Sequence, residues 1–224
     1  MPSQTRLVAR IQSHPSRREV RQRLVEGLAG IPTEIVETDF DPPSPWAGYK
    51  ECLRSLEGDD FTHALIVQDD ATVCQNIGPA LARIAEVTDC PVCLFLPMVS
   101  ATRRSAVEAA KRGECFVEIL PRGFMPVVGV LWPKDKAESF LAWSHNPRAL
   151  VRRNGVRLEQ RSDDAMGYLW MKTQRQKVLA TIPSLVQHPD DVPSTITRRR
   201  GGRTALFWHE YPWDPMSIDW RRSS

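Results

Sequence analysis

Two hydrophobic periods alternate along most of the chain. Short apolar runs bounded by turn residues are typical of buried strands, and they are separated by stretches in which apolar side chains recur every three or four positions, as in helices. The runs predict strands at residues 7–11, 33–37, 65–70, 92–96, 116–120, 127–131 and 178–181. The longer stretches predict helices at residues 16–28, 46–56, 78–87, 134–143 and 165–173, with a surface helix or mobile loop at 103–111. This alternation predicts a single α/β domain, Rossmann-like, with a mostly parallel central sheet flanked by helices.

The last part of the chain has a different pattern. Residues 183–189 predict an extended loop, and after residue 195 the hydrophobic periodicity weakens. Residues 198–224 are rich in Arg, Gly, Pro and Trp. We therefore expect a folded domain over residues 1–197 and a basic, Trp-rich extension over residues 198–224, which either wraps the domain or orders only with a ligand.

One predicted strand ends in adjacent carboxylates. The apolar run Leu65-Ile66-Val67 continues into Gln68-Asp69-Asp70. Ligands of open α/β sheets bind beyond the carboxyl ends of the strands, where acids can meet a metal ion and a phosphorylated ligand. This pattern predicts a divalent-metal and nucleotide site. The alternative is that Asp69 and Asp70 cap the next helix, because Asp is a favoured N-cap and turn residue.

The composition excludes several classes of protein. With 42% hydrophobic and 25% charged residues, the chain resembles ordinary globular proteins and lies far from disordered or fibrous ones. No stretch approaches the ~18 apolar residues of a membrane helix, and the amino terminus lacks a secretory signal, so we expect a cytoplasmic protein with no membrane partner. The five cysteines, an odd number, argue against a disulfide framework, and we expect Cys90 and Cys93 in the core.

Arginines cluster near both ends, although the net charge of +3 is too small to demonstrate nucleic-acid binding. Such clusters either hold phosphates or form a solvated face. The clusters comprise Arg17, Arg18, Arg21 and Arg23 near the start, and Arg198, Arg199, Arg200, Arg203, Arg221 and Arg222 near the end.

Three features follow one another in a recognisable order: the strand that ends in Gln68-Asp69-Asp70, a helix that opens with Asp163-Asp164, and a late loop that ends in His188. On these motifs the chain, over about residues 6–195, resembles glycosyltransferases of the GT-A fold, nearest to small bacterial and bacteriophage transferases. The resemblance implies a GT-A-like fold. It also implies that Asp70 and His188 are the protein ligands of a divalent cation.

The resemblance further places nucleotide contacts at two strand ends. Gln68 and Asp69 would face the nucleoside, and residues just after the first strand would contact the nucleotide; these are Gln12, Ser13, His14 and either Arg17 or Arg18. The family usually has an acid where this chain has Gln68, and an amide can hydrogen-bond a ribose hydroxyl but is a poor metal ligand. The diphosphate would complete the coordination of Mn²⁺ or Mg²⁺. For His188 the alternative is a loop histidine satisfied by the backbone.

Asp164 would be the general base that deprotonates the acceptor hydroxyl, a role typically worth roughly 10²–10⁴-fold in rate. Asp163 would orient the acceptor. The alternative for both is helix capping, with Ser162 or Asp163 at the N-cap and Asp164 placed favourably against the helix dipole.

Together these features predict an inverting, metal-dependent glycosyltransferase with a UDP-sugar as donor. The expected acceptor is a hydroxymethylpyrimidine base in phage DNA, with terminal arginines contacting phosphates and tryptophans stacking on bases, in the host cytoplasm. Three alternatives stay open: a protein or saccharide acceptor, a metal-dependent phosphoryl-transfer enzyme or nuclease, and a non-catalytic DNA-binding protein.

Overall fold

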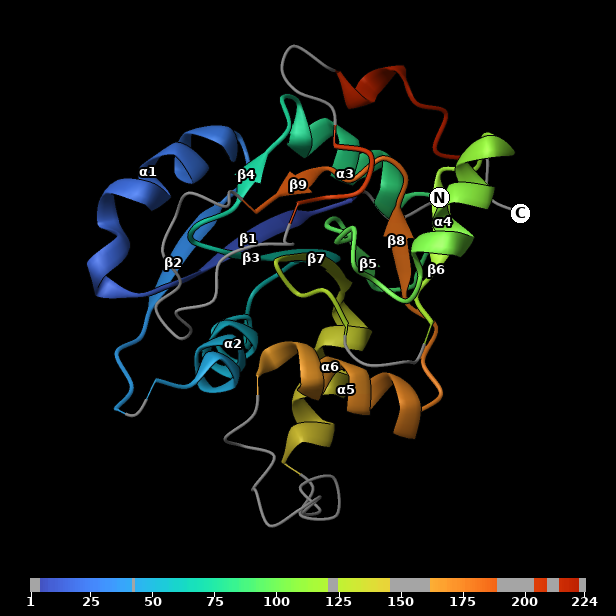
Figure 1. Cartoon of the computed structure of the whole chain (residues 1–224). Helices are drawn as coiled ribbons and strands as arrows, with labels where there is room; N and C mark the ends of the chain where they lie inside the picture. The colour runs from blue at the N-terminus through green and yellow to red at the C-terminus, as the bar shows by residue number, and fades with distance from the viewer. Residues whose placement is uncertain are drawn as a thin grey trace.

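The computed structural model describes residues 5–41, 43–120, 125–145, 162–188, 204–208 and 214–221, and within them the chain folds around one seven-stranded sheet. Its strands are β1 (Leu7–Ser13), β2 (Thr33–Glu37), β3 (His63–Gln68), β5 (Val92–Cys93), β6 (Phe116–Glu118), β7 (Gly129–Pro133) and β8 (Leu179–Thr181). Their hydrogen-bonded order is β2-β1-β3-β7-β5-β8-β6. β1 pairs in parallel with β2 and β3, and β5 pairs in parallel with β8, whereas β6 and β7 run antiparallel to their neighbours. The sheet is therefore mixed but mostly parallel, as predicted (Figure 1).

A second, smaller sheet lies at one end of the main sheet. It consists of β4 (Thr72–Val73) and β9 (Val186–Gln187), which pair antiparallel with each other. These short strands were not predicted, because two residues held by a distant partner leave no periodic signal in the sequence.

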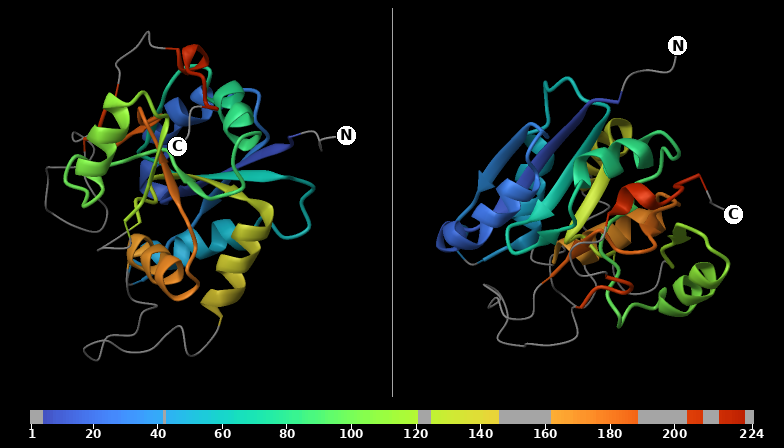
Figure 2. Two further views of the ribbon diagram at one scale, coloured as in Figure 1. Left: turned by 90° about the vertical axis from the view of Figure 1, so that its right-hand side faces the viewer. Right: turned by 90° about the horizontal axis from the view of Figure 1, so that it is seen from above.

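Helices cover both faces of the main sheet (Figures 1 and 2). One face carries α1 and α3, and the other carries α2, α5 and α6, while α4 packs beside β6. None of the helices in the described part of the chain is long and apolar enough to cross a bilayer. The α-helices are α1 (Arg18–Gly27), α2 (Pro45–Arg54), α3 (Ile77–Ala85), α4 (Arg103–Lys111), α5 (Lys134–Ser144) and α6 (Asp163–Thr173), with short 3-10 turns η1 (Pro15–Arg17) and η3 (Pro215–Ser217).

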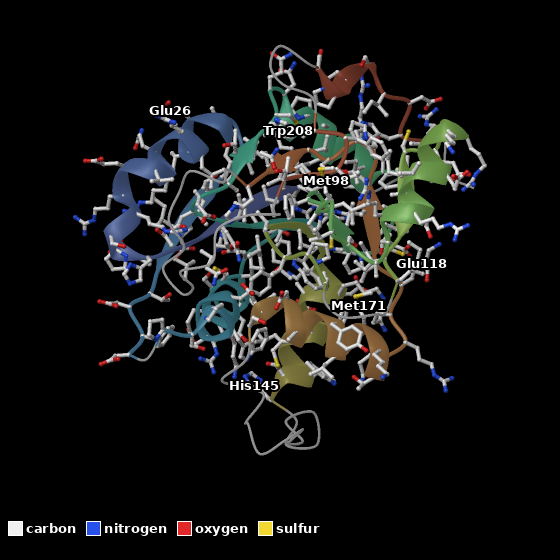
Figure 3. The ribbon with its side chains drawn as sticks, viewed as in Figure 1. Glu26, Met98, Glu118, His145, Met171 and Trp208 are labelled. Carbon is white, nitrogen blue, oxygen red and sulfur yellow. The ribbon has the colours of Figure 1, made fainter. Side chains whose placement is uncertain are left out.

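The core on the α2, α5 and α6 face is built from aromatic side chains. The ring centroids of Trp132, Phe140 and Trp170 lie 5.2–5.5 Å apart, the range in which aromatic pairs attract each other. Trp132 Nε1 donates a hydrogen bond of 2.8 Å to the hydroxyl of the fully buried Tyr49, so this polar pair is satisfied inside the core. Charged side chains such as Glu26 on α1 and Glu118 on β6 project outward (Figure 3).

Element types agree with the hydrophobic pattern, and the boundaries shift by a few residues. The strand predicted at 33–37 coincides with β2, and 103–111 is a helix. The strand predicted at 92–96 shortens to Val92–Cys93, because after Cys93 the chain leaves the regular ladder. The helix predicted from residue 165 begins two residues earlier, at Asp163. Cys93 lies in the core, whereas Cys90 is only half-buried.

Two pieces of the C-terminal extension pack on the domain. Leu206 N donates to Leu96 O at 2.7 Å, beside a β-bridge between Pro97 and Ala205. Trp220 is 2% exposed, and its ring lies 5.6 Å from that of Phe116. These pieces agree with the wrapping alternative, whereas residues 198–203, with four of the clustered arginines, lie outside the described residues.

Candidate functional site

The carboxyl ends of β1 and β3 lie side by side and bring two polar segments together. The strands are parallel, with Gln12 opposite Gln68, so residues 14–17 and the acids Asp69 and Asp70 emerge at the same edge. From β1 the chain passes to β2 on one side and then to β3 on the other. This reversal of strand order is the topological switch point at which open α/β sheets bind their ligands.

Asp70 is buried, with two basic side chains against one carboxylate oxygen. Its Oδ2 lies 2.5 Å from Nη1 of Arg17 and 3.2 Å from Nε2 of His188. The side chains of Asp70 and His188 are only 5% and 4% exposed. Burial would raise the pKa of Asp70, but the hydrogen bonds and charges of His188 and Arg17 hold it below its ordinary value. Asp70 is therefore an ionised carboxylate in a dry setting, and its Oδ1 has no hydrogen-bond partner among the described residues.

The small β4–β9 sheet delivers His188 to this edge. β4 begins two residues after Asp70, and its Thr72 lies opposite Gln187, which precedes His188. Residues 70 and 188 are thus adjacent in space although they are 118 positions apart in the sequence. The loop predicted at 183–189 contains this short strand.

β9, which directly precedes His188, packs against β7 and the C-terminal extension. A Cβ built on Gly129 would lie 3.0 Å from Cγ2 of Val186, so glycine at 129 makes room for β9. The Oε1 atom of Gln187 accepts hydrogen bonds from the backbone N–H of His188 at 3.0 Å and of Ala205 at 2.8 Å. Gln187 was not among the predicted site residues, and its position next to His188 is the sequence signal that could have indicated it.

Asp69 faces the turn that follows β1. Its Oδ2 accepts from the backbone N–H of His14 at 2.9 Å, and its Oδ1 lies 2.9 Å from Nη1 of Arg17. Arg17 therefore bridges Asp69 and Asp70, and its side chain is 11% exposed, against 72% for Arg18. Burial opposes the charge of Arg17, but the two carboxylates raise its pKa above the ordinary value. Of these two arginines, Arg17 belongs to the site.

Gln12 and His14 lie at the same edge with partners within the protein. Gln12 Nε2 donates to Pro45 O at 2.8 Å, which orients the amide, and its Oε1 is buried with no partner among the described residues. A Cβ on Gly48 would lie 3.0 Å from that Nε2, so glycine allows α2 to approach Gln12 closely. His14 is the N-cap residue of η1, and its Nδ1 accepts from Ser16 N at 3.2 Å.

Gln68 reaches across to the start of α6. Its Nε2 donates to Oδ2 of Asp163 at 3.0 Å, so in this structure the amide is turned toward an acid of the protein. Asp163 is 5% exposed, and burial, followed by the charge of Asp164, raises its pKa to about 7. Asp164 is half-buried and thus more accessible than Asp163.

The structure shows which of the candidate acids cap a helix. The helix after β3, α3, begins at Ile77 with Asn76 at its N-cap, so Asp69 and Asp70 do not cap it. At α6, Ser162 is the N-cap and makes no side-chain cap hydrogen bond. Asp163 accepts the N–H of Asp164 at 2.9 Å and so satisfies one free donor of that helix.

A divalent cation at this edge would have few protein ligands. The described residues contain no group of three or more His, Cys, Asp or Glu side chains that could hold a metal. Asp70 and His188 would supply two ligands. Their present separation of 3.2 Å is that of a direct hydrogen bond, which a cation between them would replace. The unpartnered Oδ1 of Asp70 offers a further lone pair. A cation here would need oxygens from a ligand or from water.

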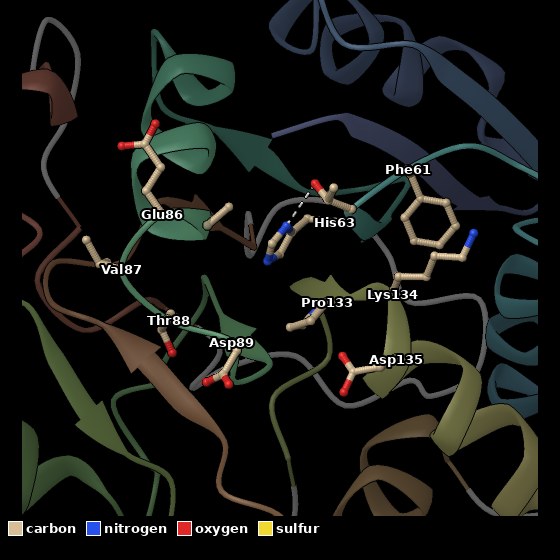
Figure 4. Close-up of a pocket in the computed structure, with 11 residues that line it drawn as sticks. Phe61, His63, Glu86, Val87, Thr88, Asp89, Pro133, Lys134 and Asp135 are labelled. Carbon is tan, nitrogen blue, oxygen red and sulfur yellow. Dashed lines mark hydrogen bonds between the residues drawn. The ribbon is translucent and has the colours of Figure 1, made fainter. Parts of the chain in front are cut away.

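A hollow lies at the opposite edge of the sheet, at the amino end of β3 (Figure 4). His63 lines it, and its Nδ1 is 3.2 Å from Oγ1 of Thr62, while its Nε2 is buried without a partner among the described residues. The other polar side chains that line it are those of Glu86, Thr88, Asp89, Lys134 and Asp135. None of the predicted site residues lines this hollow.

Comparison with known proteins adds little to this geometry. No protein-family model matches the chain, and no curated protein matches it. Among solved structures, the chain is similar to A197 from STIV at 15% sequence identity and a TM-score of 0.47, over 82% of this chain and 84% of that one. A similarity at this level carries no argument about function, so the assignment depends on the site itself.

Proposed function

We propose that the protein is a metal-dependent glycosyltransferase with a GT-A-like fold, which transfers a sugar from a UDP-sugar to an acceptor hydroxyl. The observation that carries this proposal is the approach of Asp70 to His188, at 3.2 Å, at the carboxyl end of β3. The position of this pair at the topological switch point between β1 and β3 supports it, because nucleotides bind there in open α/β sheets.

Asp70 and His188 would hold Mn²⁺ or Mg²⁺, which when bound neutralises the negative charge that develops on a departing diphosphate. Arg17 supplies a guanidinium beside them and can form charge-assisted hydrogen bonds with phosphate oxygens. Oε1 of Gln12, which has no partner among the described residues, would accept a hydrogen bond from an N–H group of the base. The hydrogen bond from His14 N to Asp69 holds the turn that follows β1. These residues form the proposed donor site.

Asp164 is the proposed general base, since it is more accessible than Asp163 and lies at the amino end of α6, next to the donor site. Asp163 is a positioning residue. The oxygens of its carboxyl group accept from Gln68 and from the backbone N–H of Asp164, and Asp163 therefore links the start of α6 to the end of β3. Deprotonation of the acceptor hydroxyl by Asp164 would make that oxygen a better nucleophile toward the sugar.

The proposed acceptor is a hydroxymethylpyrimidine base in DNA, with a protein or saccharide hydroxyl as the alternative. Trp220 does not fit the stacking role expected of the terminal tryptophans, because it is buried against Phe116. Arg221 is exposed and remains suited to a phosphate contact. If the acceptor is DNA, transfer should weaken steeply as salt is added, whereas a neutral saccharide acceptor predicts little salt dependence.

A thermal-shift experiment tests the donor site. UDP together with Mn²⁺ should raise the melting temperature, because a ligand that binds only the folded state stabilises it by about 2.7 kcal/mol at a hundred times its Kd. UDP-sugars should then release UDP when a suitable acceptor is added. If no nucleoside diphosphate stabilises the protein with either metal, the proposal is wrong. Release of phosphate or cleavage of DNA without a sugar donor would instead support a phosphoryl-transfer enzyme or nuclease.

A further inference from the structure

Arg17 lies between the two acids of the candidate site, Asp69 and Asp70. Its Nη1 lies 2.9 Å from Oδ1 of Asp69 and 2.5 Å from Oδ2 of Asp70. The same Oδ2 atom lies 3.2 Å from Nε2 of His188. The guanidinium and a cation held by Asp70 and His188 would therefore compete for one carboxylate oxygen.

The charges of the site explain why both cations would not bind there together. With His188 neutral, as a metal-binding imidazole must be, two carboxylates and one guanidinium leave a formal charge of −1. The side chains of Asp69, Asp70 and Arg17 are only 5%, 5% and 11% exposed. Water therefore screens little of the repulsion between Arg17 and an incoming divalent ion. A diphosphate brings several negative oxygens, so it gives the guanidinium and the metal separate partners.

We propose that Arg17 is the resident counter-ion of the site and couples cation binding to nucleotide binding. The divalent cation gains Asp70 only when the guanidinium turns from Asp70 to the diphosphate. Free metal then binds weakly, and metal and nucleotide bind together. This inference rests on the proposed function, since it assumes that metal and diphosphate share this edge of the sheet.

The local structure allows such a movement. Arg17 is the last residue of the short η1 turn, whose backbone is held by the hydrogen bond from Arg17 N to His14 O at 3.0 Å. The side chain can thus change partners without breaking a strand or a long helix. Arg21, one turn further along the chain, offers a matched control, because its Nη1 pairs with Glu37 at 2.6 Å and with Ser13 at 2.9 Å.

The test measures Mn²⁺ binding by electron paramagnetic resonance, with and without UDP, in the wild type, Arg17→Met and Arg21→Met. In the wild type, UDP should tighten Mn²⁺ binding at least tenfold. Arg17→Met should bind Mn²⁺ alone at least tenfold more tightly than the wild type does, and UDP should add much less. Arg21→Met should behave like the wild type.

Two results would overturn the inference, and only one of them would also overturn the proposed function. If UDP promotes Mn²⁺ binding to the wild type but Arg17→Met binds Mn²⁺ alone no more tightly, Arg17 is a structural ion pair and the proposed function stands. If neither protein binds Mn²⁺ with or without UDP, both proposals fail.

Should Arg17→Met not fold, Arg17→Gln replaces it, since the amide keeps a donor for Asp69 without the charge. A rise in the melting temperature of Arg17→Gln with Mn²⁺ alone, larger than in the wild type, supports the inference, and an equal response contradicts it.

Discussion

The two ends of β3 differ in how their charged groups are arranged, although each has a histidine and several carboxylates nearby. At the carboxyl end, Asp70 and His188 touch and are almost fully buried. At the amino end, His63 lines an open hollow in which the side chain of Asp135 is 70% exposed (Figure 4). The carboxyl end thus concentrates charged groups in a buried position. The contrast shows that the candidate site is defined by the convergence of buried ionic groups and not by a hollow in the surface.

The two ends also differ in the electrostatic state that burial favours. Burial lowers the pKa of His63 below its ordinary value, although the charge of Asp135 acts in the opposite direction, so burial favours the neutral imidazole. At the other end, burial acts against the charge of Asp70, but His188 and Arg17 outweigh it and lower its pKa. At one end, therefore, burial favours a neutral side chain, whereas the other end holds buried ion pairs.

The largest expected effect comes from removing the charge of Asp70. Asp70→Asn keeps the size of the side chain but loses a metal ligand, and loss of several kcal/mol of charge stabilisation corresponds to about 10²–10⁴-fold in turnover. The stabilisation by UDP plus Mn²⁺ should disappear in a thermal-shift measurement. Asp135→Asn, at the opposite end of β3, is the matched control and should respond like the wild type. If UDP plus Mn²⁺ stabilised Asp70→Asn as much as the wild type, the carboxyl end of β3 would not differ from the amino end in binding the ligand.

A smaller effect, on stability, is expected from Asp163. Burial and the charge of Asp164 raise its pKa to about 7 from the ordinary 3.8. The native state therefore holds a proton that the unfolded state has lost, and the free energy of unfolding should fall by about 4 kcal/mol as the pH rises from about 4 to about 7.

Asp163→Asn removes this contribution, and its urea-unfolding free energy should change less with pH over the same range. The exposed Asp135→Asn serves again as control and should keep the pH dependence of the wild type. Identical pH profiles for Asp163→Asn and the wild type would show that Asp163 is ionised in the native state.

The smallest effect on ligand binding is expected from substitution of His63, which lies at the amino end of β3. His63→Gln should leave the affinity for UDP and Mn²⁺ unchanged within about 0.5 kcal/mol, or roughly twofold, since distant sites act independently. Its lowered pKa means that the native state binds fewer protons than the unfolded state near pH 6, so His63 costs stability on acidification. His63→Gln should therefore lose less stability than the wild type between pH 7 and pH 5, as measured by urea unfolding.

Much of the fold was predictable because it follows local patterns. The apolar run that ends in Asp69-Asp70 is β3, and the alternation of periods predicted the helix-covered sheet. The direction of the strands could not be predicted in the same way. Residues 127–131 indicated a strand, but no local sequence pattern shows that β7 lies antiparallel between β3 and β5. The β4–β9 pairing, in which Thr72 meets Gln187, depends on residues too far apart for any local rule.

The candidate site was predictable only as a set of residue types. The acids after β3 and the late histidine were recognisable, whereas their partners depend on packing across the fold. Arg17 and Arg18 are neighbours in one cluster, and the sequence alone could not show that the first is buried between two acids while the second faces solvent. The contact between Gln68 and Asp163 joins residues 95 positions apart. The raised pKa of Asp163 follows from the burial of its side chain, which also depends on packing between distant parts of the chain.

The most direct test of the account asks whether an imidazole of this protein binds the cation. In the Mn²⁺–UDP complex of the wild type, pulsed electron paramagnetic resonance should detect ¹⁴N coupled to the metal. The signal should vanish in His188→Gln and persist in His63→Gln. A Mn²⁺–UDP complex without coupled nitrogen, or one whose nitrogen signal survives His188→Gln, would contradict the claim that Asp70 and His188 hold one cation.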